Sequence, residues 1–222
     1  MSGRKVVTLD GPAGVGKTTL ARTVAGRLGV PYLDTGAMFR CLALKLGPGA
    51  ETLSAEELRA RCAACTFSLS GSGDTSVLSC NGVPIGQEVR TEQVGLLASR
   101  LAAVPVVREL LKEAQRAIAG QTDVVVEGRD MGTVVFPEAR HKFFLDARPE
   151  VRALRRLREL EARGERPDLA ALTEQIRLRD EMDRSRAAAP LRPAEDAVLV
   201  DTSDLDIDGV LACILEHIAA QR

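Results

Sequence analysis

The chain has 222 residues, 45% of them hydrophobic, which suits one α/β domain with a single core. Its formal net charge of −1 argues against a general nucleic-acid or membrane-surface binder, because both need a basic excess. Five cysteines make an odd count without the spacing of a secreted domain, and the sequence shows no signal-like segment or apolar run of about 18 residues. We therefore expect a cytoplasmic protein that binds neither nucleic acid nor membrane.

The first predicted element is a buried strand at 6–9, which runs directly into a glycine-rich loop. Residues 11–18 read Gly-Pro-Ala-Gly-Val-Gly-Lys-Thr, the phosphate-loop pattern, and a helix at 17–28 follows. In such a loop the backbone N–H groups point at phosphate oxygens, Lys17 reaches the outer phosphates and the Thr18 hydroxyl holds Mg²⁺. This order favours a nucleoside triphosphate site over a plain glycine-rich turn. The predicted ATP-binding residues are Gly11, Pro12, Ala13, Gly14, Val15, Gly16, Lys17, Thr18 and Thr19.

A second parallel strand is expected at 30–34, followed by a break at Thr35-Gly36 and a helix at 37–46. Thr35 and Arg40 would then lie at the carboxyl edge of the sheet, where open α/β folds bind ligands. Taken singly, each has a simpler interpretation: a helix cap for Thr35 and a surface charge for Arg40.

The next segment interrupts the parallel pattern with a small antiparallel insert. Its expected elements are a capped helix at 54–65, strands at 66–70, 76–80 and 83–85, and a hairpin turn at Asn81-Gly82. We expect this insert to shape specificity; the alternative is a stabilising flap without ligand contacts. Cys62 and Cys65 have the gap of a redox or zinc pair, but with no other ligands nearby they are interpreted as plain helix residues.

The second half of the chain alternates helices with core strands. The expected elements are helices at 91–103 and 106–119 separated by Pro105, strands at 123–127, 141–146 and 197–201, and helices from 149 and over 169–182. In the helix that opens at Pro149, we expect Val151, Leu154 and Leu157 to face inward. This helix and the next are polar enough to stand off the core as a lid. The closing helix is predicted to bury an apolar stripe of Ile207, Val210, Leu211, Ile214, Leu215 and Ile218.

Arginine is concentrated late in the chain, with twelve between Arg148 and Arg192. Many of them can form ordinary surface pairs with neighbouring Glu and Asp. Four arginines at strand ends or in the presumed lid could instead converge on a second anionic group; they are Arg40, Arg129, Arg179 and Arg186. Such a clamp is what phosphoryl transfer between two anions requires. We therefore favour a kinase over a conformational switch or a motor, and the two histidines, His141 and His217, are expected to play no part.

Several separated segments resemble the bacterial-type cytidylate kinases over essentially the whole length. They are residues 9–17, 34–40 (Asp-Thr-Gly-Ala-Met-Phe-Arg), Arg90-Thr91, Ala98-Ser99, Val107-Arg108, 127–137 (Glu-Gly-Arg-Asp-Met-Gly-Thr-Val-Val-Phe-Pro), and 179–191 with its ending Ala189-Pro190-Leu191. The block at 127–137 is the most specific, since many kinases share the first segment.

The resemblance implies a phosphate-loop fold with five parallel strands flanked by helices, a small antiparallel β insert and a helical lid. It implies transfer of the ATP γ-phosphoryl group to CMP or dCMP by a monomer that uses Mg²⁺. The implied CMP-binding residues are Thr35, Arg40, Ser99, Arg108, Arg129, Asp130, Asp183 and Arg186. The implied catalytic residues are Lys17, Arg129, Arg179 and Arg186, with Thr18 on Mg²⁺ and Glu127 orienting water on the metal. The corresponding division is a core of 1–62, 104–154 and 187–222, an acceptor-binding insert of 63–103 and a lid of 155–186.

Three positions depart from the family's pattern. Thr35 stands where Ser is frequent and keeps the hydroxyl, Phe39 replaces a Tyr and loses one, and Glu127 replaces an Asp with a longer reach. Two rival functions stay open: a kinase for UMP or a metabolite alcohol, and a regulatory nucleotide switch without turnover.

Overall fold

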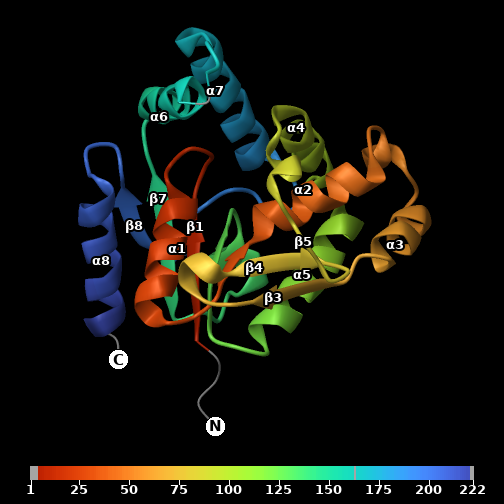
Figure 1. Ribbon diagram of the computed structural model, residues 1–222, viewed down its shortest axis with the longest axis horizontal. Coiled ribbons are helices and arrows are strands. Elements are labelled where there is room, and N and C mark those ends of the chain that lie inside the picture. The colour runs from red at the N-terminus through yellow and green to blue at the C-terminus, as the bar shows by residue number, and fades with distance from the viewer. Residues whose placement is uncertain (1–4, 163, 221–222) are drawn as a thin grey trace.

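The computed structural model describes residues 5–162 and 164–220, so Arg163 of the predicted lid and the outermost residues of the predicted core lie outside it. Its centre is a five-stranded sheet in the order β2-β6-β1-β7-β8, with every neighbouring pair parallel (Figure 1). The strands are β1 (Val6–Asp10), β2 (Tyr32–Asp34), β6 (Val124–Gly128), β7 (His141–Asp146) and β8 (Val198–Asp201). The predicted parallel α/β fold is confirmed.

The sheet is buried on both faces, as β6 shows most clearly. Val124 and Val126 belong to one apolar cluster and Val125 to the other, because successive strand side chains point to opposite faces. One face is covered by α1 (Lys17–Leu28) and α8 (Ile207–Ala220). The other is covered by α2 (Thr35–Leu46) and α5 (Pro105–Ala119). No helix in the described part of the chain is long and apolar enough to cross a membrane.

The register of the strands brings three loops to one edge of the sheet. Asp10 pairs with Gly128, and Asp34 pairs with Glu127, so β1, β2 and β6 end side by side. The segments that leave these ends therefore share one edge, as expected for an open parallel sheet.

The predicted antiparallel insert is confirmed as a three-stranded sheet in the order β3-β4-β5. Asn81 (φ 54°) and Gly82 (φ 77°) are both left-handed, which is the hairpin turn that the Asn-Gly pair predicts. The surrounding elements are α3 (Ala55–Ala63), β3 (Phe67–Ser70), β4 (Val77–Cys80), β5 (Val83–Pro84), α4 (Glu92–Leu101), the 3₁₀ turns η1 (Ala50–Thr52), η2 (Gly73–Thr75) and η3 (Gln87–Arg90), and the π-helical turn η4 (Met131–Val135).

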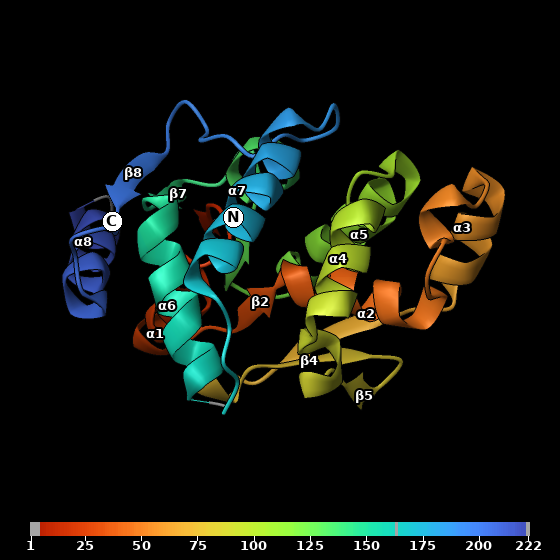
Figure 2. The ribbon, with the colours of Figure 1, turned by 90° about the horizontal axis from the view of Figure 1, so that it is seen from above.

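Two helices, α6 (Pro149–Glu161) and α7 (Leu169–Ser185), stand above the carboxyl ends of the central strands (Figure 1). Seen from above, α7 lies between α6 and the helices α4 and α5 (Figure 2). The helix pair is where the sequence predicts a lid.

Several element boundaries predicted from the sequence were wrong. The Asp34 carboxylate accepts a hydrogen bond from the N–H of Ala37 (2.9 Å) and caps α2, so Thr35-Gly36 begins the helix rather than breaking the chain. Pro105 is the first residue of α5, where its missing N–H costs nothing, and does not separate two helices.

Two predicted apolar faces also need correction. On α6, Leu154 is 38% exposed, whereas Arg152 is the side chain that is buried, at 1%. On α8, Ile207 is 51% exposed because it lies at the first turn, beyond the edge of the sheet's core. Helix α7 continues past Met182 to Ser185, which places Asp183 on the helix.

Candidate active site

The loop after β1 has a backbone that only glycine supports at its closest approach to the sheet. Gly11 has φ 147°, and a Cβ there would lie 2.1 Å from the carbonyl oxygen of Leu145. Gly16 caps α1 in the left-handed region (φ 88°), and no side chain accepts a hydrogen bond at this helix start. The first N–H groups of α1 are therefore left for an external acceptor, at the positive end of the helix dipole.

Lys17 lies at the start of α1 and is only 8% exposed, with Nζ donating to the carbonyl oxygen of Pro12 (2.6 Å). Burial lowers the pKa of this amine, and the charge of Arg129 lowers it further, while Glu127 and Asp10 raise it. Arg179 adds to the same positive field. An anion bound here would favour the charged amine, which is the behaviour of a phosphate-binding lysine.

Glu127, near the end of β6, receives two hydroxyl hydrogen bonds on one oxygen. Oε1 accepts from Tyr32 (2.6 Å) and from Thr18 (2.9 Å), while Oε2 is buried with no hydrogen-bond partner among the described residues. Burial raises the pKa of this carboxyl, and the nearby Asp34 carboxylate adds to the rise. A hydroxyl and a carboxylate oxygen with an open lone pair are the hard oxygen ligands that Mg²⁺ prefers. The pair therefore fits a divalent cation held beside a phosphate loop.

Arg129 and Asp183 form an ion pair between the loop after β6 and helix α7. Arg129 Nε donates to Asp183 Oδ2 at 2.9 Å, and Nη1 donates to the carbonyl oxygen of Gly128 (3.3 Å). Burial raises the pKa of the Asp183 carboxyl, but the charge and hydrogen bond of Arg129, together with the charges of Arg179 and Arg186, lower it by more, so the net pKa lies below its ordinary value. The pair therefore stays ionised.

Asp130 is the carboxylate at the centre of a second cluster. It is 3% exposed and accepts a hydrogen bond from Arg108 of α5, while Arg186 Nη2 lies 3.5 Å from its Oδ1. Phe39 lies under the Arg108 guanidinium, 5.8 Å from ring centre to Cζ. Phe39, Arg108, Asp130 and Met131 line a pocket of about 20 Å³, which has room for about one water molecule. The apolar ring, the carboxylate and the guanidinium are groups that recognise a flat, polar ring, and such a ring enters only if the lining side chains move apart.

Two arginines in the same region form no ion pair with a carboxylate of the described residues. Arg179 Nε is buried without a partner among the described residues, and burial together with the charge of Arg129 lowers the pKa of Arg179 to about 10. Arg40 donates only to the carbonyl oxygens of Val89 (3.1 Å) and Thr91 (3.2 Å). Both remain cationic at neutral pH, so positive charge in this part of the molecule exceeds the negative charge facing it. That excess is what an anionic ligand needs.

Comparison with known proteins decides the family. The cytidylate kinase family model matches residues 7–220. The chain belongs to the cytidylate kinase family. It is 65% identical over 217 residues to a cytidylate kinase of Nitratidesulfovibrio vulgaris strain Hildenborough, covering 98% of this chain and 94% of that one. It is 57% identical over 213 residues to a cytidylate kinase of Oleidesulfovibrio alaskensis, covering 96% and 97%.

Solved structures agree on the fold of this cytidylate kinase family member. The shikimate kinase of Bacteroides thetaiotaomicron superimposes with a TM-score of 0.51 at 17% identity, covering 97% of this chain and 98% of that one. At this identity the likeness concerns the fold alone, which is that of the phosphate-loop kinases. Kinases of this fold class use ATP with a divalent metal.

The residues predicted for cytidylate kinase chemistry fall into two groups in space. Thr18 and Glu127 are hydrogen-bonded to each other beside Lys17, and the four arginines singled out from the sequence interact electrostatically with one another or with Asp183 and Asp130. Ser99 lies half-buried on α4 and takes no part in the hydrogen bonds described above. The Thr35 hydroxyl donates to the carbonyl oxygen of Glu127 (2.7 Å), a role that neither the helix-cap interpretation nor the family resemblance predicts.

The late arginines divide in the way that the two sequence interpretations anticipated. Arg148, Arg156, Arg177 and Arg184 form ion pairs in which both or one of the partners are well exposed. Asp180 differs from these, because it is buried and paired with Arg152. Cys62 is buried on α3, but Cys65 lies beyond the end of that helix, so its interpretation as a helix residue was wrong.

Sequence reasoning missed three contributors to the site: Asp10, Tyr32 and Arg152. Asp10 accepts from the N–H groups of Met131 (2.9 Å) and Gly132 (2.8 Å) and thereby fixes the segment that carries Arg129 and Asp130. Burial raises its pKa to about 6. An acidic residue at the end of a buried strand, directly before a phosphate loop, was a usable signal for Asp10. Tyr32 and Arg152 had none, because each resembles an ordinary element residue.

Proposed function

We propose that the protein transfers the γ-phosphoryl group of ATP to CMP or dCMP, giving ADP and CDP or dCDP. The observation that carries the proposal is Asp130, a buried carboxylate beside a small pocket and adjacent in sequence to Arg129, which interacts with Lys17. Asp130, proposed to bind the base, and Arg129, proposed to bind the phosphate, are thus neighbours in the loop after β6. Membership of the cytidylate kinase family and of the phosphate-loop kinases supports the same reaction.

The pocket chemistry suits cytosine. Cytosine presents an amino donor at C4 beside acceptors at N3 and O2. Asp130 is the acceptor for the amino group, and Arg108 and Ser99 are the donors for the other two atoms. Phe39 supplies an apolar wall to the base. The hydroxyl that a tyrosine would add at this position is absent, so no contact of the acceptor depends on it.

The acceptor's phosphate is assigned to the arginine cluster and Thr35. Arg40, Arg129 and Arg186 hold its oxygens, Asp183 takes a hydroxyl of the sugar, and Arg179 faces the transferring group. Thr35 can take part once its hydroxyl leaves the carbonyl oxygen of Glu127. Guanidinium groups suit this task because they remain charged and bind phosphate oxygens in pairs.

On the donor side, residues 11–19 bind the triphosphate and Lys17 contacts the outer phosphates. Thr18 would hold Mg²⁺ and Glu127 would orient water on it, as the open Oε2 allows. Mg²⁺, when bound, neutralises charge on the β- and γ-phosphates. Lys17 and Arg179 stabilise the charge that develops on the oxygens of the transferring group.

The transfer is an in-line displacement. A bond forms between an oxygen of the acceptor phosphate and the γ-phosphorus, and the bond from that phosphorus to the β,γ-bridging oxygen breaks with its electron pair going to ADP. The acceptor oxygen is already ionised near neutral pH, so the chain needs no strong general base. The arginines lower the repulsion between the two anions, which is the main barrier to their approach.

The test is incubation with MgATP and a panel of acceptors: CMP, dCMP, UMP, AMP, GMP and a set of sugar alcohols, with nucleotide products resolved by chromatography. Diphosphates from CMP and dCMP at rates far above the others are expected. Preference for UMP or an alcohol would replace the acceptor assignment, and triphosphate binding without any product would favour a regulatory switch.

We also infer that the enzyme acts as a monomer in the cytoplasm and that residues 155–186 close over the bound nucleotides as a lid. The polar pair of α6, which ends at Glu161, and α7, which begins at Leu169, supports the lid. Light scattering at micromolar concentration tests the monomer, and a fluorophore pair on α7 and α4 that shortens its separation on adding both nucleotides tests the closure.

A further inference from the structure

Arg152 of α6 is a guanidinium buried directly beneath the phosphate loop. Its side chain is 1% exposed, its Nε donates to the carbonyl oxygen of Ala147 (2.8 Å), and its Nη1 donates to that of Ala13 (3.1 Å). A Cβ on Gly14 would lie 3.2 Å from the Cβ of Arg152, so the loop backbone rests on this side chain.

The contact to Ala13 has a consequence for the next peptide N–H. A trans peptide points its carbonyl oxygen and its N–H to opposite sides. Because the Ala13 oxygen is turned toward Arg152, the N–H of Gly14 is turned away from Arg152, and Gly14 is an exposed residue. Arg152 thus acts on the direction of a donor that the loop needs for phosphate.

The charge of Arg152 is matched by Asp180 of α7. Nη1 donates to Asp180 Oδ1 (3.0 Å) and Nη2 donates to Oδ2, a two-pronged pair in which Asp180 is 8% exposed. A pair with this geometry fixes the angle as well as the distance between its two helices.

On helix α7, Asp180 lies between two residues that are proposed to act on the acceptor or on the transferring group. Arg179 precedes it, and Asp183, which binds Arg129 at 2.9 Å, follows three residues later. Helix α7 therefore contacts Arg152, which supports the phosphate loop, through Asp180. Through Asp183 it also contacts Arg129, which is proposed to bind the acceptor's phosphate.

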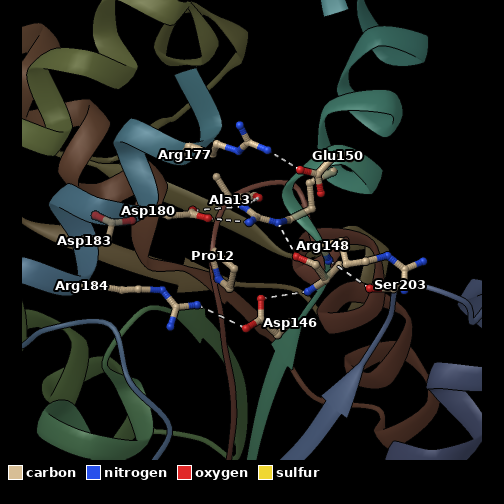
Figure 3. A network of polar contacts seen from close by, with 12 residues as sticks. Pro12, Ala13, Asp146, Arg148, Glu150, Arg177, Asp180, Asp183, Arg184 and Ser203 are labelled. Carbon is tan, nitrogen blue, oxygen red and sulfur yellow. Dashed lines mark hydrogen bonds and ion pairs between the residues drawn. The ribbon is translucent and has the colours of Figure 1, made fainter. Parts of the chain in front are cut away.

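Other ion pairs join the same parts of the chain but do not reach the loop. Glu150 of α6 pairs with Arg177 of α7 with side chains 58% and 54% exposed, and Arg184 pairs with Asp146 at 48% and 45% (Figure 3). Exposed pairs of this kind contribute little to stability. Holding the two helices together does not by itself require a buried arginine under the loop.

We propose that Arg152 is a positioning residue for phosphoryl transfer: paired with Asp180, it orients the Ala13–Gly14 peptide for the triphosphate and sets the register of α7, so that Arg179 faces the group in transfer. This inference rests on the proposed function only for the chemical step; its effect on triphosphate binding does not depend on the acceptor.

The test compares a charge-free pair with a matched control. The double variant Arg152→Met/Asp180→Leu removes both buried charges at similar volume, which preserves folding in many proteins, whereas Glu150→Gln breaks the exposed pair between the same helices. Asp180→Asn is a milder second variant that keeps the shape of the side chain. Thermal melting, calorimetric binding of Mg²⁺ with adenylyl imidodiphosphate, and kcat with MgATP and CMP are measured for each.

We expect the double variant to melt below the wild type but to stay folded at the assay temperature, because Met cannot donate to the carbonyl oxygens of Ala13 and Ala147. We expect it to bind the ATP analogue at least roughly tenfold more weakly, the loss typical of a charged hydrogen bond, and to lose kcat by a similar factor. For Asp180→Asn, the affinity for the ATP analogue and kcat should lie between those of the double variant and the wild type. For Glu150→Gln, both should stay within about twofold of the wild type. A double variant that binds and turns over like the wild type would overturn the proposal, as would equal losses in Glu150→Gln. If the double variant melts below the assay temperature, binding of the ATP analogue and kcat are compared between Asp180→Asn and the wild type at a temperature where both are folded, and that comparison decides the proposal.

The outcome is separable from that of the proposed function. A wild type that binds the ATP analogue but phosphorylates no cytidine acceptor would refute the assigned reaction. The calorimetric comparison of the variants would still decide whether Arg152 positions the loop.

Discussion

Replacing Asp130 by Asn should change which base the enzyme prefers while leaving ATP binding intact. Asn keeps the shape of the side chain and one acceptor oxygen but replaces the other oxygen with an N–H₂ donor. Cytosine, whose C4 carries a donor, then loses its unambiguous acceptor, and uracil, whose C4 carries an acceptor, gains a donor. A base contact of this kind contributes about 1–3 kcal/mol to discrimination, which is a change of roughly 5- to 150-fold in the ratio of kcat/KM for CMP over UMP.

The surroundings of Asp130 explain why Asn is the better substitution than Ala. The carboxylate is 3% exposed and faces two guanidiniums, Arg108 and Arg186, which are themselves largely buried. Removing the side chain leaves Arg108 without its carboxylate partner and leaves Arg186 with the more distant Asp183 alone (3.9 Å), a loss on the order of 3–5 kcal/mol in stability that would obscure the effect on the base. Asn still offers one oxygen to Arg108.

The assay is kcat/KM for CMP and for UMP, with binding of the ATP analogue measured separately. Asp196→Asn is a matched control, because that carboxylate pairs with Lys142, is 63% exposed and is not among the residues of the candidate site. An equal fall for CMP and UMP, or a parallel loss of affinity for the ATP analogue, would mean that Asp130 holds the arginines in place and does not read the base.

Three other predictions follow from single groups. Gly11→Ala should destabilise the fold by about 1–3 kcal/mol in urea titrations because of the 2.1 Å approach, whereas Gly164→Ala, also at positive φ but facing open space, should cost roughly 1–2 kcal/mol at most. Iodoacetamide at pH 7.5 should label exposed Cys213 well before Cys80, which is buried and whose thiol pKa burial raises; comparable rates in peptide mapping would contradict this. The pKa of Asp10 is about 6 in the folded protein and 3.8 in the unfolded chain, so the folded state holds this proton more tightly. The contribution of this proton to the free energy of unfolding is therefore complete below pH 3.8 and is lost as the pH rises through 6. Asp10→Asn should therefore reduce the fall in unfolding free energy across this range, and identical pH profiles would refute the assignment.

Elements with a local cause could be predicted from the sequence. The Asn81-Gly82 turn and the cap of α3, where Ser54 and Glu57 bond each other's backbone N–H, depend on residues that are neighbours in the chain. The phosphate loop is equally local, since its strand, glycines and helix are consecutive. Parallel order then follows from alternating strands and helices, which is why the sheet was predicted correctly.

The errors arise where a distant segment decides the local outcome. An apolar pattern turns Leu154 toward the core, but the face of α6 that is buried carries Arg152 and meets the phosphate loop, which offers carbonyl oxygens in place of apolar side chains. A guanidinium satisfies those oxygens and a leucine cannot, so Arg152 takes the buried position. Amphipathic periodicity assumes an apolar partner and fails where the partner is polar backbone.

The site could be predicted as a set of residues but not as a set of pairs. Arg40, Arg129 and Arg179 come together because the strands that precede or support them end at one edge, a consequence of topology. Their pairings depend on side-chain geometry: Arg129 bonds Asp183, and Arg40 bonds only carbonyl oxygens. No spacing in the sequence distinguishes these cases.

The difference between matched and unmatched arginines bears on what the site does. Arg152 has a full two-pronged carboxylate partner and is 1% exposed, as a structural charge should be. Arg179 is half-buried, its Nε is buried without a partner among the described residues, and its pKa is lowered, a cost that the charges of Asp183 and Glu92 offset only in part. Such a cost is tolerated where a ligand relieves it. Because Arg179 interacts electrostatically with Arg129 and with Lys17, an anion near all three would relieve its charge, as the proposed phosphoryl transfer between the phosphate loop and the arginine cluster requires.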